Sequence, residues 1–252
     1  MNKVRIAFDR AAPRYDEAAA LQREVGTLLL QSIPTCPADT ILDTGCGTGH
    51  GTQLLRTRWP QARLIASDFA FSMLRTAGGG VCADLERLPF AARTFDLYWS
   101  NLAFQWCDGE RAVSEAARVL IPGGRLAVSS LAPGTLAELD SVFSGLDSHR
   151  HVLDFAPAQT LTHACHAAGF QEVTLNTVTL RCYHPDLKSL LHSLKSLGAN
   201  QVGSHRRLGL LGRRGWQTLE GRYEALRSAE GLPVTYEVVV CTAKHDPSGK
   251  LA

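Results

Sequence analysis

The first feature that could do chemistry is a glycine-rich loop after a short apolar segment. Residues 40–43 run directly into Asp43-Thr44-Gly45-Cys46-Gly47-Thr48-Gly49. Glycine lets the backbone turn sharply from strand to helix and lets a ligand approach it closely. A dinucleotide-binding loop, G-x-G-x-x-G, would place its third glycine at position 50, which is His50. The spacing therefore disfavours a dehydrogenase.

Three acidic residues, Asp43, Asp68 and Asp84, stand at the ends of three successive strand-like segments. Parallel sheets bind ligands at the carboxyl ends of their strands. A carboxylate can accept hydrogen bonds from two sugar hydroxyls at once. We therefore expect these acids and the glycine loop to form one binding site.

Strand-like and helical segments alternate along the first half of the chain. We expect helices at 15–33, 50–59, 70–77 and 109–120, and strands at 40–43, 63–68, 81–83, 95–100 and 125–131. Such alternation predicts an α/β fold with a mostly parallel sheet and helices on both faces. Further on, we expect helices at 135–146, 160–168, 186–197 and 216–228, and strands at 173–180 and 234–243.

The predicted elements divide the chain by role. We expect a single domain over residues 1–252, with an N-terminal lid helix region at 1–37 and a cofactor-binding half at 38–131. Residues 132–252 would form the substrate-side half. The helices predicted between the last two strands would be an insertion over the active edge of the sheet.

Composition excludes several classes of protein. The 252 residues carry 26 Lys plus Arg and 24 Asp plus Glu, a net charge of +2 that argues against a whole-surface nucleic-acid or membrane binder. No apolar run approaches the roughly 18 residues of a membrane span. The seven cysteines form no C-x-x-C pair, so we expect reduced thiols, no structural metal and a cytoplasmic protein.

The glycine loop and the three acids together resemble the class I S-adenosylmethionine-dependent methyltransferases, which have a Rossmann-like fold. The resemblance covers residues 41–131 and includes the turn Arg118–Gly124. It implies that Asp43 and the loop hold the methionine portion of S-adenosylmethionine, that Asp68 binds the ribose and that Asp84 binds the adenine amino group. Met73 and Leu85 would enclose the adenine ring. The cofactor-binding residues implied are Asp43, Thr44, Gly45, Cys46, Gly47, Gly49, Asp68, Phe69, Met73, Asp84, Leu85, Asn101 and Leu102.

Downstream motifs resemble a narrower family, the malonyl-[acyl-carrier protein] O-methyltransferases of biotin synthesis. The resemblance rests on S-N-L-A-F-Q-W-C from Ser100 and on further stretches at 8–15, 134–139, 194–199 and 233–236. It implies methylation of the free carboxylate of a malonyl thioester on acyl carrier protein. The chain departs from the family's H-x-N-x-F segment, because Leu153 replaces the Asn and Asp154 replaces the following basic residue.

Several side chains are candidates for holding the substrate. A carboxylate is already ionised at pH 7, so it needs alignment and a polar partner rather than a general base. The candidates are Tyr15, Gln105, His151 and Lys195. Because the family's carrier protein is acidic, a basic patch should meet it. The densest basic segment contains Arg206, Arg207, Arg213 and Arg214.

Other functions share part of this pattern. A methyltransferase for another small acid or for a quinone precursor would have the same glycine loop. A protein that binds S-adenosylmethionine without turnover would have the loop but no substrate cleft. A nucleic-acid methyltransferase is disfavoured, because the Asn101–Phe104 stretch lacks both prolines of an N-P-P-Y motif.

Overall fold

A computed structural model describes residues 2–146, 149–196 and 212–246. Within these residues a seven-stranded sheet has the order β3-β2-β1-β4-β5-β7-β6. The strands are β1 (Thr40–Thr44), β2 (Arg63–Asp68), β3 (Val81–Cys82), β4 (Phe95–Ser100), β5 (Leu120–Leu131), β6 (Phe170–His184) and β7 (Leu232–His245). The first five strands pair in parallel, whereas β7 runs antiparallel to both β5 and β6.

The helices alternate with the strands as far as β5. They are α1 (Asn2–Ala11), α2 (Tyr15–Ala18), α3 (Ala20–Ser32), α4 (His50–Arg58), α5 (Phe71–Thr76), α6 (Gly109–Val119), α7 (Ala137–Phe143), α8 (Ala158–Ala167), α9 (Leu187–Ser196) and α10 (Arg213–Glu224). Two single 3-10 turns lie at Ala12–Arg14 and Phe104–Trp106. Asp108 caps α6, accepting from the backbone N–H groups of Glu110 and Arg111.

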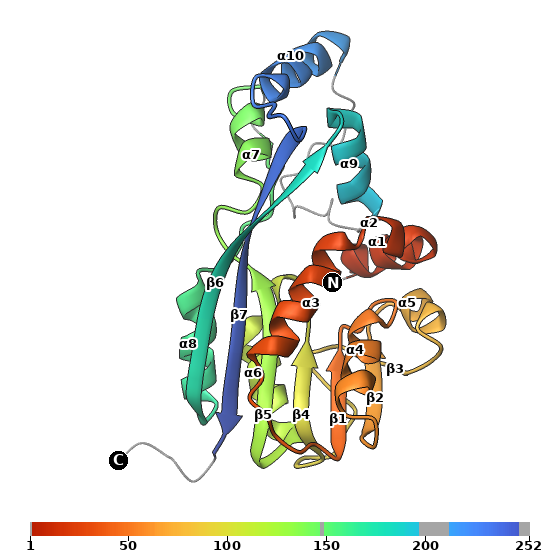
Figure 1. The fold of residues 1–252 in the computed structure, drawn as a ribbon, viewed down its shortest axis with the longest axis vertical. Helices are drawn as coiled ribbons and strands as arrows, with labels where there is room; N and C mark the ends of the chain where they lie inside the picture. The colour runs from red at the N-terminus through yellow and green to blue at the C-terminus, as the bar shows by residue number, and fades with distance from the viewer. Residues whose placement is uncertain (1, 147–148, 197–211, 247–252) are drawn as a thin grey trace.

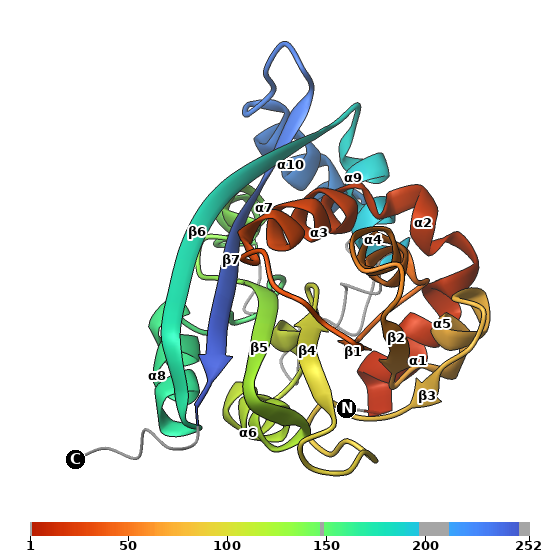
Figure 2. The same ribbon diagram turned by 60° about the horizontal axis from the view of Figure 1, so that its bottom comes forward.

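Two apolar cores lie on opposite faces of the sheet, because successive strand residues point in opposite directions. Ile41 and Trp99 pack with α3 and α4 on one face, whereas Leu42 and Tyr98 pack with α6 and α8 on the other. Figure 2 shows α3 and α4 on one side of the sheet and α6 and α8 on the other. The predicted α/β fold, mostly parallel with helices on both faces, is thus confirmed.

The strands β6 and β7 are longer than the sequence predicted and extend beyond the parallel part of the sheet (Figure 1). Their pairing continues as far as His184 opposite Leu232. The helices α7, α9 and α10 gather around this extension (Figure 1) and add Leu139, Leu190 and Tyr223 to the first core. We predicted shorter strands because the alternation of apolar and polar residues weakens near their ends. The backbone hydrogen bonds between β6 and β7 nevertheless continue through these more polar residues.

The N-terminal region differs from the helix expected at 15–33. That helix is broken at Ala19, and a separate helix, α1, precedes it. The prediction of 15–33 as one continuous helix was therefore wrong. The pattern that could have revealed α1 is Val4, Phe8 and Ala11, which fall on one helical face. Within the described ranges, no helix is long and apolar enough to cross a membrane.

Candidate functional site: the cofactor loop and the adjoining cavity

The glycine loop joins β1 to α4 and lies against the loop that follows β4. Gly45 has a φ of +64°, and a Cβ built on it would lie 2.5 Å from the Cβ of Ala103. Any larger residue would therefore push the two loops apart. The loop also borders a cavity of about 340 Å³. Asp43, Arg23 and Trp99 line this cavity as well.

Asp68, at the end of β2, fastens this loop. One of its carboxylate oxygens, Oδ2, accepts from the backbone N–H of Gly47 at 2.9 Å, and the other, Oδ1, accepts from Ala70 at 2.8 Å. The side chain is buried, and burial raises its pKa to about 6 despite these hydrogen bonds. Asp68 also lines a second cavity, so the same residue positions the loop and borders a space open to a ligand.

Asp43 is the second buried acid of the loop. It accepts a hydrogen bond from the Thr52 hydroxyl at 2.6 Å, and burial raises its pKa to about 7. It shares the 340 Å³ cavity with the guanidinium-bearing side chain of Arg23. An acid and a base in one cavity suit the ammonium and carboxylate groups of an amino acid such as the methionine portion of the cofactor. Sequence reasoning missed Arg23, because it lies on α3 rather than near the loop.

The second cavity, about 50 Å³, contains the residues expected around adenine. Its walls include Asp68, Phe69, Met73, Asp84, Leu85, Leu102, Trp106 and Phe8. Phe8 packs edge-on against Phe69 and Trp106, with ring centroids 5.9 and 5.5 Å apart. The three rings therefore form one aromatic wall of this cavity.

Two hydrogen bonds fasten the N-terminal segment to α5 and to the glycine loop. The Asp9 carboxylate accepts from the backbone N–H of Ser72 at 2.8 Å, and Thr48 donates to Asp16 at 2.5 Å. These contacts hold α1 and α2 against the two cavities, which Phe8, Tyr15 and Asp16 help to line. No local sequence pattern indicates either contact, because each joins segments more than 30 residues apart.

Asn101, expected to bind the cofactor, lines both cofactor cavities, but its amide also holds the site together. Its Nδ2 donates to the backbone oxygen of Gln22 at 2.8 Å, and its Oδ1 accepts from Ser129 at 2.8 Å. Ser129 in turn accepts from the backbone N–H of Leu102, whose φ is +51°. Asn101 therefore joins α3 to the loop after β4.

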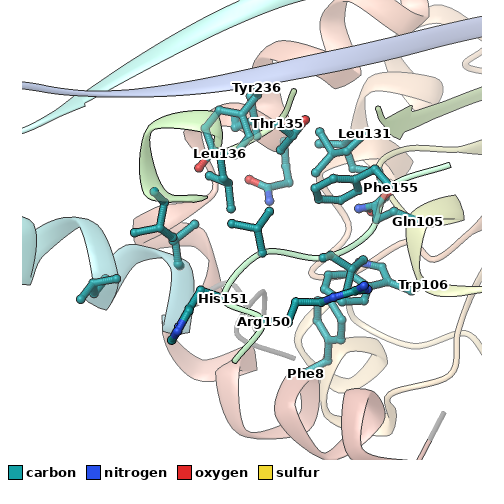
Figure 3. Close-up of a pocket in the computed structure, with 18 of the residues that line it drawn as sticks. Phe8, Gln105, Trp106, Leu131, Thr135, Leu136, Arg150, His151, Phe155 and Tyr236 are labelled. Carbon is teal, nitrogen blue, oxygen red and sulfur yellow. Dashed lines mark hydrogen bonds between the residues drawn. The ribbon is translucent and has the colours of Figure 1, made fainter. Parts of the chain in front are cut away.

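A third cavity, of about 320 Å³, adjoins the other two and is mostly apolar (Figure 3). Its apolar walls come from several elements and include Leu21, Leu102, Leu131, Leu136, Leu139, Phe143, Val152, Leu153, Phe155, Leu191 and Leu194. Tyr15 lines all three cavities. Burial, followed by the charge of Asp68, raises the pKa of Tyr15 above its usual range, so its hydroxyl stays protonated and neutral.

Of the other three residues predicted to hold the substrate, two line the apolar cavity and one does not. Gln105 and His151 line the apolar cavity. Gln105 donates from Nε2 to the Leu102 carbonyl at 2.6 Å, while its Oε1 is buried without a hydrogen-bond partner. His151 stacks on Phe143 with ring centroids 3.6 Å apart. Lys195 is exposed on α9 and is not among the residues that line this cavity.

The predicted basic patch is described only in part. Arg213 and Arg214 are exposed in the first turn of α10. Arg206 and Arg207 lie outside the described residues. A basic residue that the prediction missed, Arg150, lines the apolar cavity.

The fold and the site together define a methyltransferase of the Rossmann-like class. The Methyltransferase domain family matches residues 42–128. The YcgJ protein from Bacillus subtilis has the same fold, with a TM-score of 0.61 and 16% identity over 88% of this chain and 98% of that one.

Two relatives give the particular family. The chain is 44% identical to the malonyl-[acyl-carrier protein] O-methyltransferase of Herminiimonas arsenicoxydans, over 96% of this chain and 95% of that protein. It is 41% identical to the protein of the same description from Dechloromonas aromatica, over 96% of this chain and 94% of that one. The chain belongs to the malonyl-[acyl-carrier protein] O-methyltransferase family, and it is an S-adenosylmethionine-dependent methyltransferase.

The two raised pKa values predict a pH-dependent affinity for S-adenosylmethionine. A positively charged ligand favours the ionised forms of Asp43 and Asp68, whose pKa values are about 7 and about 6. Ligand binding should therefore release protons, and affinity should fall about 10- to 100-fold from pH 7.5 to pH 5.5. Calorimetry in two buffers of different ionisation enthalpy measures both quantities.

The raised pKa values of Asp43 and Asp68 also make folding stability depend on pH. Stability falls as pH rises, whereas the affinity for S-adenosylmethionine increases. Because both folded-state pKa values are raised, the stability they contribute is complete below the unfolded pKa and is lost as pH rises through about 6 to 7. The increase in Tm caused by S-adenosylmethionine should be larger at pH 8 than at pH 5.5. Asp43→Asn should flatten the pH dependence of affinity. An affinity that does not change with pH in the unmodified protein would contradict this assignment.

Proposed function

We propose that the chain methylates the free carboxylate of a malonyl thioester carried on acyl carrier protein, as the names of its relatives indicate for them. One observation carries the proposal: the apolar 320 Å³ cavity shares Tyr15, Leu102 and Trp106 with the adenine-side cavity. A small acyl group in the apolar cavity would therefore lie next to the bound cofactor.

The chemistry of carboxyl methylation suits an apolar cavity. S-adenosylmethionine supplies a methyl group on a positively charged sulfur, the carboxylate oxygen bonds to that carbon as the carbon–sulfur bond breaks, and both charges disappear. No proton moves, so none of the cavity residues must act as a general base. The leucines and Phe155 keep water away from the carboxylate. Water would stabilise the charged carboxylate more than the less charged transition state, and it would therefore slow the reaction.

The residues around the reacting oxygen then have positioning roles. The Tyr15 hydroxyl stays neutral and can donate a hydrogen bond without neutralising the nucleophile. Gln105 already donates one of its two Nε2 N–H groups to the Leu102 carbonyl, whereas Tyr15 lines all three cavities. We therefore assign alignment of the carboxylate to Tyr15 rather than to Gln105.

The carrier protein is part of the proposal. Arg213 and Arg214, exposed in the first turn of α10, would meet acidic side chains of the carrier together with Arg206 and Arg207. Such complementary charge raises the association rate more than the affinity. The product is a neutral ester, so enzymes that extend apolar acyl chains could accept it.

A substrate series tests the proposal. The protein is incubated with methyl-labelled S-adenosylmethionine and with malonyl-, succinyl- or acetyl-acyl carrier protein. We expect base-labile label on the malonyl carrier, because it presents the free carboxylate that the proposal requires, and none on the acetyl carrier, which lacks one. Label on none of the three, with the cofactor still bound, would leave a methyltransferase for another acceptor, such as a small acid or a quinone precursor.

A further inference from the structure

The apolar cavity needs a cationic partner if it is to hold a carboxylate, because burying a charge without a partner is costly. We propose that Arg150 binds the substrate carboxylate and that Asp154 holds Arg150 between turnovers. This inference rests on the proposed function and names the residue that selects an acidic substrate.

Arg150 is placed to reach the cavity. It lies in the segment between α7 and α8 and is one of the residues that line the 320 Å³ space. Figure 3 shows its side chain extended toward Trp106 and Phe8. Trp106 and Phe8 also line the adenine-side cavity, so the guanidinium lies on the side from which the methyl group must come.

The present partner of Arg150 holds it weakly. Its Nη1 lies 3.5 Å from Oδ2 of Asp154, with side-chain exposures of 46% and 80%. Exposed ion pairs of this kind contribute little to stability. Asp154 does not line the apolar cavity but a neighbouring one of about 500 Å³. Arg150 and Asp154 therefore line different cavities, and the guanidinium could exchange the exposed Asp154 for a carboxylate in the apolar one.

Tyr15 can align the carboxylate but is neutral. Two other uncharged groups of the apolar cavity, Thr135 and Gln105, are also less suitable than Arg150 as its charged partner. The Thr135 hydroxyl donates to the Glu237 carbonyl at 3.2 Å and accepts from the Glu237 N–H at 3.0 Å. Gln105 is uncharged and already donates one of its two Nε2 N–H groups to the Leu102 carbonyl. Arginine, in contrast, remains charged at every working pH and has a planar fork that matches a carboxylate.

The exchange of partners also favours product release. A carboxylate bound by the guanidinium keeps a further lone pair on each oxygen for attack on the methyl group. Methylation removes the negative charge of the substrate, whereas Asp154 keeps its own. Arg150 then returns to Asp154, and the neutral ester loses its strongest polar contact.

Two variants with opposite expected effects test the inference. Arg150→Gln should raise the KM for malonyl-acyl carrier protein about 10- to 100-fold. This factor corresponds to the binding free energy of one hydrogen bond to a charged group. Asp154→Asn should lower that KM about 2- to 5-fold, because it removes the carboxylate that competes with the substrate for Arg150. The size of the effect follows from the small free energy of an exposed ion pair. Acetyl-acyl carrier protein, which lacks the carboxylate, should inhibit the wild type and Arg150→Gln equally.

Other outcomes would overturn the inference. If the ion pair only supports the segment 149–155, both substitutions should raise the KM. If Arg150 contacts the carrier, inhibition by the acetyl carrier should weaken in Arg150→Gln. An unchanged KM in Asp154→Asn would exclude the competing role of Asp154. Wild-type protein that fails to methylate the malonyl carrier would instead refute the proposed function. Unchanged affinity for S-adenosylmethionine shows that each variant is folded.

Discussion

Replacing Asp68 by alanine should lower the affinity for S-adenosylmethionine at least 100-fold. The carboxylate accepts from the backbone N–H groups of Gly47 and Ala70, at 2.9 and 2.8 Å, and faces the adenine-side cavity. The substitution removes the fastening of the glycine loop and the proposed ribose acceptor together. Each hydrogen bond to a charged group is worth about 1.5–3 kcal/mol, so losing two accounts for this effect. Calorimetric titration measures it.

Two further variants separate binding from folding. Asp68→Asn keeps one acceptor oxygen, so its affinity for S-adenosylmethionine should be lower than that of the wild type and higher than that of Asp68→Ala. Glu220→Ala removes an exposed carboxylate from α10 and should leave the affinity unchanged. If Asp68→Ala is folded by circular dichroism and still binds the cofactor within tenfold of the wild type, Asp68 does not hold the ribose.

Replacing Tyr15 by alanine should lower kcat/KM for the carrier-bound substrate about 1,000-fold. Its side chain lines all three cavities, so its loss merges them and admits water. Tyr15→Phe keeps the wall and removes only the hydroxyl, for which we expect about a 10-fold loss. Burial and the charge of Asp68 raise the pKa of this hydroxyl, so the rate should show no inflection from Tyr15 up to pH 9. Steady-state kinetics across pH measure each effect.

The matched control is Tyr183→Phe, because Tyr183 is 39% exposed on β6 and lines none of these three cavities. It should behave as the wild type. A Tyr15→Phe variant with full activity would show that the hydroxyl contributes nothing to alignment. A Tyr15→Ala variant with full activity would contradict the arrangement of the three cavities.

Local patterns in the sequence were enough to predict the parallel sheet and the residues around its cofactor loop. Alternation of strands and helices fixes the order of the elements, and parallel strands present their ends at one edge. Asp43, Asp68 and Met73 therefore line the cofactor cavities as neighbours, although 30 residues of sequence separate the first from the last.

The rest of the site depends on contacts that no local pattern records. Arg23, Asp9 and Arg150 reach the site from the N-terminal helices and from the segment before α8. Asp9 lies in a family-like stretch and Arg150 lies next to the candidate His151, but no motif assigns either of them, or Arg23, to a ligand. The family-like run that suggested Lys195 contributes Leu194 to the cavity, whereas Lys195 is exposed on the same helix. A helical motif alone does not say which of its faces is turned inward.

The position of the transferred methyl group tests the central claim most directly. Malonyl-acyl carrier protein has two possible acceptors, the carboxylate oxygen and the acidic carbon between its carbonyl groups. With S-adenosylmethionine that is labelled with carbon-13 on the methyl group, the NMR spectrum of the product distinguishes a methyl ester from a methyl group on carbon. We predict the ester signal alone. A methyl group on carbon, or an unlabelled carrier under conditions where the cofactor is bound, would contradict carboxylate methylation in this cavity.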